Sequence, residues 1–114
     1  MKGQLTIINL YGCKPKFMKD KKRLALFGKA LSKEIKMKPY GNAIIHRFGK
    51  GDLRGYSAVQ LIETSDIMVH LDEFENKAFI DIFSCKSFDS KKAKDFAKNY
   101  FNSKRAISKT ILRK

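Results

Sequence analysis

The chain has 114 residues, of which 43% are hydrophobic and 11% aromatic, so it can fold around one core but is too short for two. No apolar run approaches the ~18 residues of a membrane span, and no signal-peptide pattern opens the chain. A cytoplasmic single domain over residues 1–114 without a membrane partner is therefore expected.

The formal net charge of +14 comes from twenty lysines and five arginines against eleven acidic residues. Specific reading of a nucleic-acid duplex depends on arginine, so we expect no specific nucleic-acid partner. The charge is also uneven, because residues 63–85 carry −5 whereas the segments before and after them carry +11 and +8. This acidic stretch would favour a cationic ligand.

The first half of the chain alternates between strand and helix patterns. Residues 4–10 predict a strand with Leu5 and Ile7 facing inward, and with Ile8 as a further candidate for the core. Apolar residues at helical spacing predict a helix over 19–36, with Asp20 near its positive end. Residues 39–42 are expected to end this unit.

The second half predicts four short strands, then a helix and a final strand. The strands are expected over 43–48, 56–63, 66–71 and 78–85, with a flexible loop over 49–55. The helix is expected over 90–102 with Ser87 or Ser90 as its cap, and the last strand over 106–112.

This order of elements is typical of an α+β protein. We expect a two-layer α/β sandwich in which two helices cover one face of an antiparallel sheet. The other face needs a partner if it is apolar, and a second copy of the chain is the simplest one. A homodimer formed through the sheet side, with Ser65 near the interface, is the prediction.

Ser57, Ser65, His70 and Cys85 stand on consecutive predicted strands, where antiparallel pairing brings residues together. They are either packing and turn residues or a catalytic set, and spacing alone leaves both interpretations open. The chain has no phosphate-binding glycine loop, and its two histidines and two distant cysteines predict no metal site.

Several short motifs stand together in one order along the chain. They are Tyr-Gly-Cys at 11–13, His-Arg-Phe at 46–48, Gly-Tyr-Ser-Ala-Val at 55–59, Thr-Ser at 64–65, and Ile-Asp-Ile-Phe-Ser-Cys at 80–85. With His70 between the last two, these motifs resemble the prokaryotic S-adenosylmethionine decarboxylases over about residues 4–102. The most specific part is Ser65, His70 five residues later and Cys85 fifteen beyond that.

The resemblance implies a lyase that makes its own cofactor and uses no metal. Members cut their backbone before a serine, here between Thr64 and Ser65, and that serine becomes a pyruvoyl group. The pyruvoyl carbonyl forms a Schiff base with the substrate amine, and S-adenosylmethionine is decarboxylated for spermidine biosynthesis. By the same resemblance Ser57 holds the processing intermediate, His70 is the base and Cys85 donates a proton after decarboxylation.

The implied substrate contacts are less regular. Phe48 matches a family position, whereas the segment after His70 reads Leu-Asp-Glu-Phe-Glu, so that either Glu73 or Glu75 would have to bind the substrate. This departure leaves open a pyruvoyl-dependent decarboxylase of arginine or ornithine. Thr64 and Asp66 flank the processed serine where relatives carry Glu and His, which leaves open an unprocessed, non-catalytic homologue.

Overall fold

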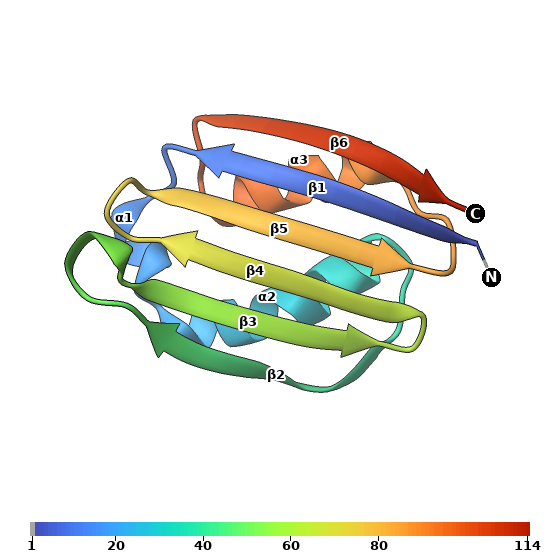
Figure 1. The fold of residues 1–114 in the computed structure, drawn as a ribbon, viewed down its shortest axis with the longest axis horizontal. Helices are drawn as coiled ribbons and strands as arrows, with labels where there is room; N and C mark the ends of the chain where they lie inside the picture. Colours follow the sequence, from blue (N-terminus) through green and yellow to red (C-terminus); the bar gives the residue numbers. More distant parts are fainter. Residues whose placement is uncertain (1) are drawn as a thin grey trace.

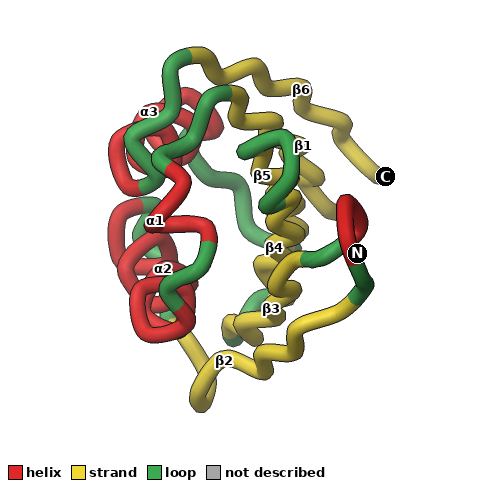
Figure 2. The backbone as a smooth tube through the Cα atoms, turned by 90° about the vertical axis from the view of Figure 1, so that its left-hand side faces the viewer, coloured by secondary structure: helices red, strands yellow, loops and turns green. Residues whose placement is uncertain are grey.

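The computed structural model describes residues 2–114 as one antiparallel sheet with three helices packed on the same face (Figures 1 and 2). The strands are β1 (Gly3–Tyr11), β2 (Pro39–Phe48), β3 (Gly55–Ile62), β4 (Ser65–Asp72), β5 (Lys77–Ser84) and β6 (Arg105–Arg113). The helices are α1 (Pro15–Met18), α2 (Lys21–Glu34) and α3 (Ser90–Tyr100), and a 3-10 turn, η1, spans Gly51–Leu53. The strand order is β2-β3-β4-β5-β1-β6, so the predicted α+β architecture is confirmed.

Helix α2 forms where the spacing predicts it and packs directly on the sheet. The Asp20 side chain accepts a hydrogen bond from the Arg23 backbone N–H at 3.1 Å, which caps the first turn. Leu24, Phe27 and Leu31 are buried against the sheet. A Cβ added to Gly28 would lie 2.4 Å from Gln60 Cβ, so glycine is needed where α2 meets β3.

Three local predictions are wrong. The short helix α1 was not expected, and it begins at Pro15, a residue suited to a first helical turn. Strand β2 already starts at Pro39 and accommodates residues 39–42 by a register shift between Tyr40 and Ile44. The cap of α3 is Asp89, whose carboxylate accepts from the Lys92 N–H at 3.0 Å, and neither predicted serine has this role.

The predicted orientation of β1 is also wrong for Leu5 and Ile7, although Ile8 is buried in the core as predicted. Its helix-facing side is polar at one end, where Gln4 and Thr6 are buried, and Leu5 and Ile7 point to the opposite face. The polar groups are satisfied there, because the Gln4 amide donates to the Phe88 carbonyl at 3.1 Å and Thr6 Oγ1 lies 3.0 Å from Thr110 Oγ1. Alternation alone cannot identify the inner face when both faces carry apolar residues.

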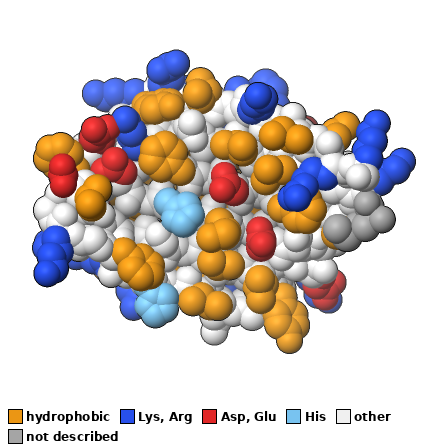
Figure 3. Space-filling view, in the orientation of Figure 1, with side chains coloured by type: hydrophobic (Ala, Val, Ile, Leu, Met, Phe, Trp, Pro, Cys, Tyr) orange, Lys and Arg blue, Asp and Glu red, His pale blue; other side chains and the backbone are white. Residues whose placement is uncertain are grey.

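The face of the sheet that no α-helix covers, called the open face below, is unusually apolar for a surface. Half-buried or exposed apolar side chains spread over it, including Leu5, Ile7, Val59, Met68, Phe79 and Phe83. Figure 3 shows these hydrophobic side chains with acidic and histidine side chains among them. The turn η1 rises on this side, away from the helices (Figure 2). None of the helices described is both long and apolar enough to cross a membrane.

Candidate functional site

The peptide bond between Thr64 and Ser65 lies in a tight hairpin between β3 and β4. Ser65 is the first residue of β4 and pairs with Ile62 of β3 and Ser84 of β5. Only Glu63 and Thr64 separate the paired residues. Ser65 is half-buried, so its hydroxyl stands at the boundary of the core and the surface.

The Thr64 carbonyl accepts a hydrogen bond from the Cys85 backbone N–H at 3.0 Å. A backbone N–H that points at a carbonyl oxygen can stabilise negative charge on that oxygen. The backbone of Cys85 is thereby placed beside the bond that Ser65 would attack. The sequence suggested a role for the Cys85 thiol but gave no signal for its amide.

The Thr64 side chain is fixed by its neighbours. Its Oγ1 accepts from Ser84 Oγ at 2.8 Å and donates to Met37 Sδ at 3.4 Å. The Lys86 N–H in turn donates to Ser84 Oγ at 3.0 Å. Glu63 and Thr64 are not among the described residues with a positive φ, so this turn has no left-handed strain.

A second cluster lies at the other end of β4, on the open face. Ser57 and His70 are direct cross-strand partners, and Ser57 Oγ lies 3.0 Å from His70 Nδ1. Their side chains line a pocket of about 260 Å³. Its further walls include Phe48, Asp52, Leu53, Asp72 and Phe79.

The structure therefore divides the four expected catalytic residues into two clusters. Ser65 and Cys85 are at one end of the sheet, and Ser57 and His70 are at the other. His70 comes five residue steps after Ser65 along β4, which corresponds to roughly 17 Å. An odd separation along a strand also directs their side chains to opposite faces. Within one chain, His70 is out of reach of Ser65.

Of the three residues expected to bind the substrate, one lines the pocket beside His70 and two do not. Phe48 lines the pocket beside His70, as a substrate contact should. Neither Glu73 nor Glu75 lines it, because Glu73 is largely buried and paired with Arg47 at 2.7 Å, and Glu75 is paired with Lys77.

The carboxylates that do line the pocket were not singled out from the sequence. They are Asp52, carried by η1, and Asp72, at the end of β4. Asp72 Oδ1 also accepts from the backbone N–H groups of Phe74 and Glu75, at 3.1 Å each, so its orientation is fixed. The acidic composition of residues 63–85 was the only signal that pointed to it.

The two cysteines differ in environment. Only 2% of the surface of Cys13 is exposed, and this burial raises the pKa of its thiol to about 11. Cys85 is exposed and lines a hollow of about 360 Å³ near the chain termini. The Cys85 thiol is therefore accessible from solvent and the Cys13 thiol is not.

Acidic side chains stand in the middle of the open face. Asp66 and Asp81 both point to it from neighbouring strands. Partial burial, with a smaller contribution from the nearby Asp81 carboxylate, raises the pKa of Asp66. Across residues 2–114 no three histidine, cysteine or acidic side chains are gathered as a metal site would need.

Comparison with known proteins identifies the family of the chain. The family model for S-adenosylmethionine decarboxylase matches residues 4–114. The chain therefore belongs to the S-adenosylmethionine decarboxylase family and is an enzyme of that type, and the resemblance seen in the motifs is confirmed.

A solved structure shows the same fold. The crystal structure of the adenosylmethionine decarboxylase from Aquifex aeolicus superimposes with a TM-score of 0.73 at 21% sequence identity. The match covers 96% of this chain and 88% of the other chain. No curated protein sequence matches the chain.

Proposed function

We propose that this chain cleaves itself between Thr64 and Ser65 and then decarboxylates S-adenosylmethionine with a pyruvoyl group made from Ser65. The observation that carries the proposal is the hydrogen bond from the Cys85 N–H to the Thr64 carbonyl, next to a half-buried serine. Membership of the family supports the substrate and does not favour arginine or ornithine in its place.

The first step is an acyl shift within the hairpin. Ser65 Oγ attacks the Thr64 carbonyl carbon, its proton passes to the departing amide nitrogen, and an ester replaces the peptide bond. The negative charge that develops on the carbonyl oxygen is stabilised by the Cys85 N–H. Hydrogen bonds from Ser84 and to Met37 keep the Thr64 side chain from moving during the attack.

The second step breaks the ester. A base removes the Cα proton of Ser65, the bond between Oγ and Cβ breaks, and the segment ending in Thr64 leaves as a carboxylate. Water then adds to the resulting dehydroalanine and ammonia departs, which leaves a ketone at position 65. The chemistry requires one base within about 3 Å of the Cα proton.

His70 of the partner subunit is proposed as this base. The chain's own His70 lies roughly 17 Å away along β4. If two open faces pack with the two-fold axis crossing the middle of β4, each Ser65 end lies over the partner's Ser57 and His70 end. The proton to be removed is on the Cα of Ser65, which lies in the sheet, so the base need not approach from the face to which the Ser65 side chain points. The apolar side chains of the open face supply the contact surface that such a dimer needs.

Substrate binding is assigned to the pocket that contains His70. When formed, the pyruvoyl carbonyl supplies the electron sink for loss of CO₂. Phe48 and Phe79 give the pocket apolar walls, and the Asp52 and Asp72 carboxylates favour a cation such as a sulfonium. In the same dimer Cys85 stands beside residue 65, where its thiol holds the proton that the product carbon must receive. The decarboxylated product would serve polyamine synthesis, here spermidine.

Intact-mass measurement of the purified protein tests the proposal. We expect two chains that meet at Thr64–Ser65, with the second blocked at its amino terminus, and a Ser65→Ala chain that stays whole. A wild-type chain that remains a single 13.1 kDa species after prolonged incubation would overturn self-cleavage and favour a non-catalytic homologue.

A further inference from the structure

We propose that the helical side of this protein, opposite the open face, binds single-stranded nucleic acid without sequence preference. This side, called the helical face below, consists of α1, α2, α3 and their connections, residues 14–38 and 86–104. The proposal rests on its charge, its side-chain chemistry and a hollow between α2 and α3. It does not depend on the decarboxylase reaction.

The positive charge of the chain is concentrated on the helical face. Residues 14–38 and 86–104 hold sixteen of the twenty-five basic residues but four of the eleven acidic ones, which gives +12 of the total +14. The remaining residues carry only +2. Burial of the open face in the proposed dimer excludes lysines from that face, but it does not explain why the helical face holds four basic residues for each acidic one. This segregation indicates a polyanionic partner.

The basic residues of this face suit phosphate contacts and not base recognition. Fifteen of the sixteen are lysines, which act as point charges. The exception, Arg23, has its guanidinium stacked between Phe17 at 3.8 Å and Tyr100 at 4.3 Å and hydrogen-bonded to the Tyr100 carbonyl, so it serves the fold. Sequence-independent binding through the phosphate backbone follows from this composition.

Three lysines lie along the outer surface of α2. Lys22, Lys29 and Lys33 fall on one stripe, opposite the buried Leu24 and Phe27. Their spacings along the helix axis are about 10 and 6 Å. Helix α3 continues the same layer, since the rings of Phe27 and Tyr100 pack at 5.0 Å. The lysines of α2 and α3 therefore belong to one layer of the fold.

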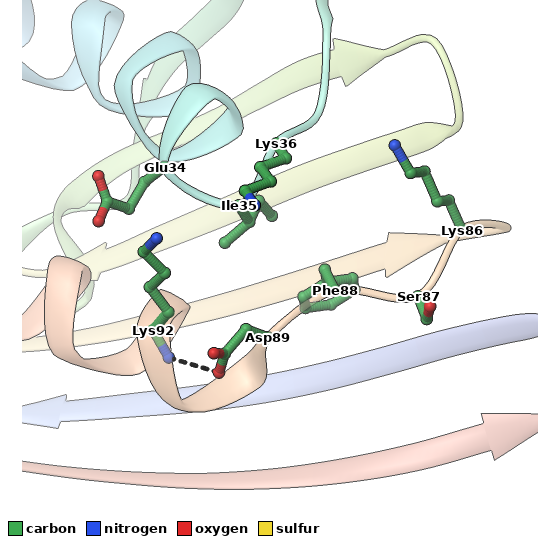
Figure 4. A pocket seen from close by; sticks show the side chains of 8 residues that line it. All are labelled: Glu34, Ile35, Lys36, Lys86, Ser87, Phe88, Asp89 and Lys92. Atoms are coloured by element: carbon green, nitrogen blue, oxygen red, sulfur yellow. Dashed lines mark hydrogen bonds between the residues drawn. The ribbon is translucent and has the colours of Figure 1, made fainter.

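A hollow of about 390 Å³ opens where the end of α2 meets the start of α3 (Figure 4). Three lysines (Lys36, Lys86 and Lys92) and two carboxylates (Glu34 and Asp89) line it, so lysines outnumber acids, and Phe88 and Ile35 contribute apolar surface. Figure 4 shows the Phe88 ring between the Lys86 and Lys92 side chains. Charged amines around an aromatic ring are the combination that binds an unpaired base and its phosphates.

The same features disfavour an anionic membrane as the partner. Binding in a membrane interface requires an apolar helix surface next to the basic one. The apolar sides of α2 and α3 are turned to the sheet, and Leu26 is the one exposed large hydrophobic residue of these two helices. A duplex offers phosphates but no unpaired base for the hollow.

The test is fluorescence anisotropy of the full protein with a labelled, mixed-sequence RNA of about 20 nucleotides, titrated at roughly 50 to 200 mM KCl. The helical variant combines Lys22→Gln, Lys33→Gln and Lys92→Gln. The control variant removes the same charge from exposed positions elsewhere, with Lys2→Gln, Lys50→Gln and Lys114→Gln. We expect the slope of log K against log salt to fall by about 2 in the helical variant, and to change little in the control.

A second variant, Phe88→Leu, tests the hollow while keeping an apolar side chain for packing. We expect the affinity for RNA to fall roughly tenfold with the salt slope unchanged, because stacking is lost but charge is not. Equal slopes for the helical and control variants would overturn the proposal. So would binding to duplex as tight as to single strand, displacement of the RNA by anionic vesicles, or no binding at the lowest salt.

Discussion

Mixing two inactive variants tests whether the processing site is shared between subunits. Ser65→Ala removes the nucleophile, and His70→Ala removes the proposed base. In a mixed dimer with shared sites, one site combines an intact Ser65 from the His70→Ala chain with an intact His70 from the partner subunit. Cleavage of the His70→Ala chain is therefore expected in mixed dimers, although neither variant completes processing alone.

The expected amount follows from the geometry. Random pairing of equal amounts of two chains places about half of the His70→Ala chains in mixed dimers, so about half should be cleaved. The His70 of the same chain cannot act as the base for its own Ser65, because the gap of roughly 17 Å along β4 far exceeds the distance for proton transfer. Strand β4 also pairs with β3 and β5 along its length, so closing the gap would break both ladders.

The assay is co-production of the two chains with distinguishable tags, followed by intact mass of each chain. The control is a chain that carries both substitutions, mixed with wild type. It has no His70 to offer its partner, so wild-type chains in those mixed dimers should stop at the ester, which hydroxylamine splits. Two results together would refute the shared site. They are full processing of wild-type chains mixed with the double variant, and no cleavage when the Ser65→Ala and His70→Ala chains are mixed.

Three further expectations concern the thiols and carboxylates. Cys85→Ser should cleave normally but lose turnover by about 10²–10⁴-fold. Cys13→Ser should instead keep its turnover per folded molecule and lose about 1–3 kcal/mol of unfolding free energy. Equal losses of activity in steady-state assays of the two variants would contradict this contrast. Burial and Asp81 raise the pKa of Asp66 above 3.8, so its carboxylate destabilises the folded protein increasingly as the pH rises from 3.8 through the folded-state pKa. Asp66→Asn should therefore stabilise the protein more at pH 7 than at about pH 4, and urea unfolding that shows the same gain at both values would refute it. Asp72→Asn keeps the turn acceptor but removes the charge, so KM for a cationic substrate should rise roughly tenfold with a smaller change in kcat; an unchanged KM would argue against this pocket as the cation site.

The elements of this fold were largely predictable because their patterns are local. The apolar spacing of α2 and the alternation in β5 identify these elements without tertiary information. The orientation of β1 was not predictable, because Gln4 and Thr6 are buried only through partners more than eighty residues away. Hydrogen bonds to distant residues leave no trace in a local pattern.

The candidate site was predictable as a set of residues but not as a geometry. The resemblance identified Ser65, His70 and Cys85 together, although nothing in their spacing says that they act in one site. An odd separation along one strand, as between Ser65 and His70, already argues against contact within one chain. The contribution of the Cys85 N–H depends on how β5 ends beside the hairpin, which only the structure contains.

The charge distribution also bears on how a cationic substrate reaches a protein with a net charge of +14. The helical face carries nearly all of this charge, and the sheet separates it from the pocket that contains Asp52 and Asp72. Packed layers lie about 10 Å apart, which exceeds the Debye length of about 8 Å at physiological salt. The lysines therefore repel the substrate only weakly, while the nearby carboxylates attract it. A polyanion on one side and a cation on the other can thus bind the same small domain, and occupation of the helical face should leave KM for the substrate nearly unchanged.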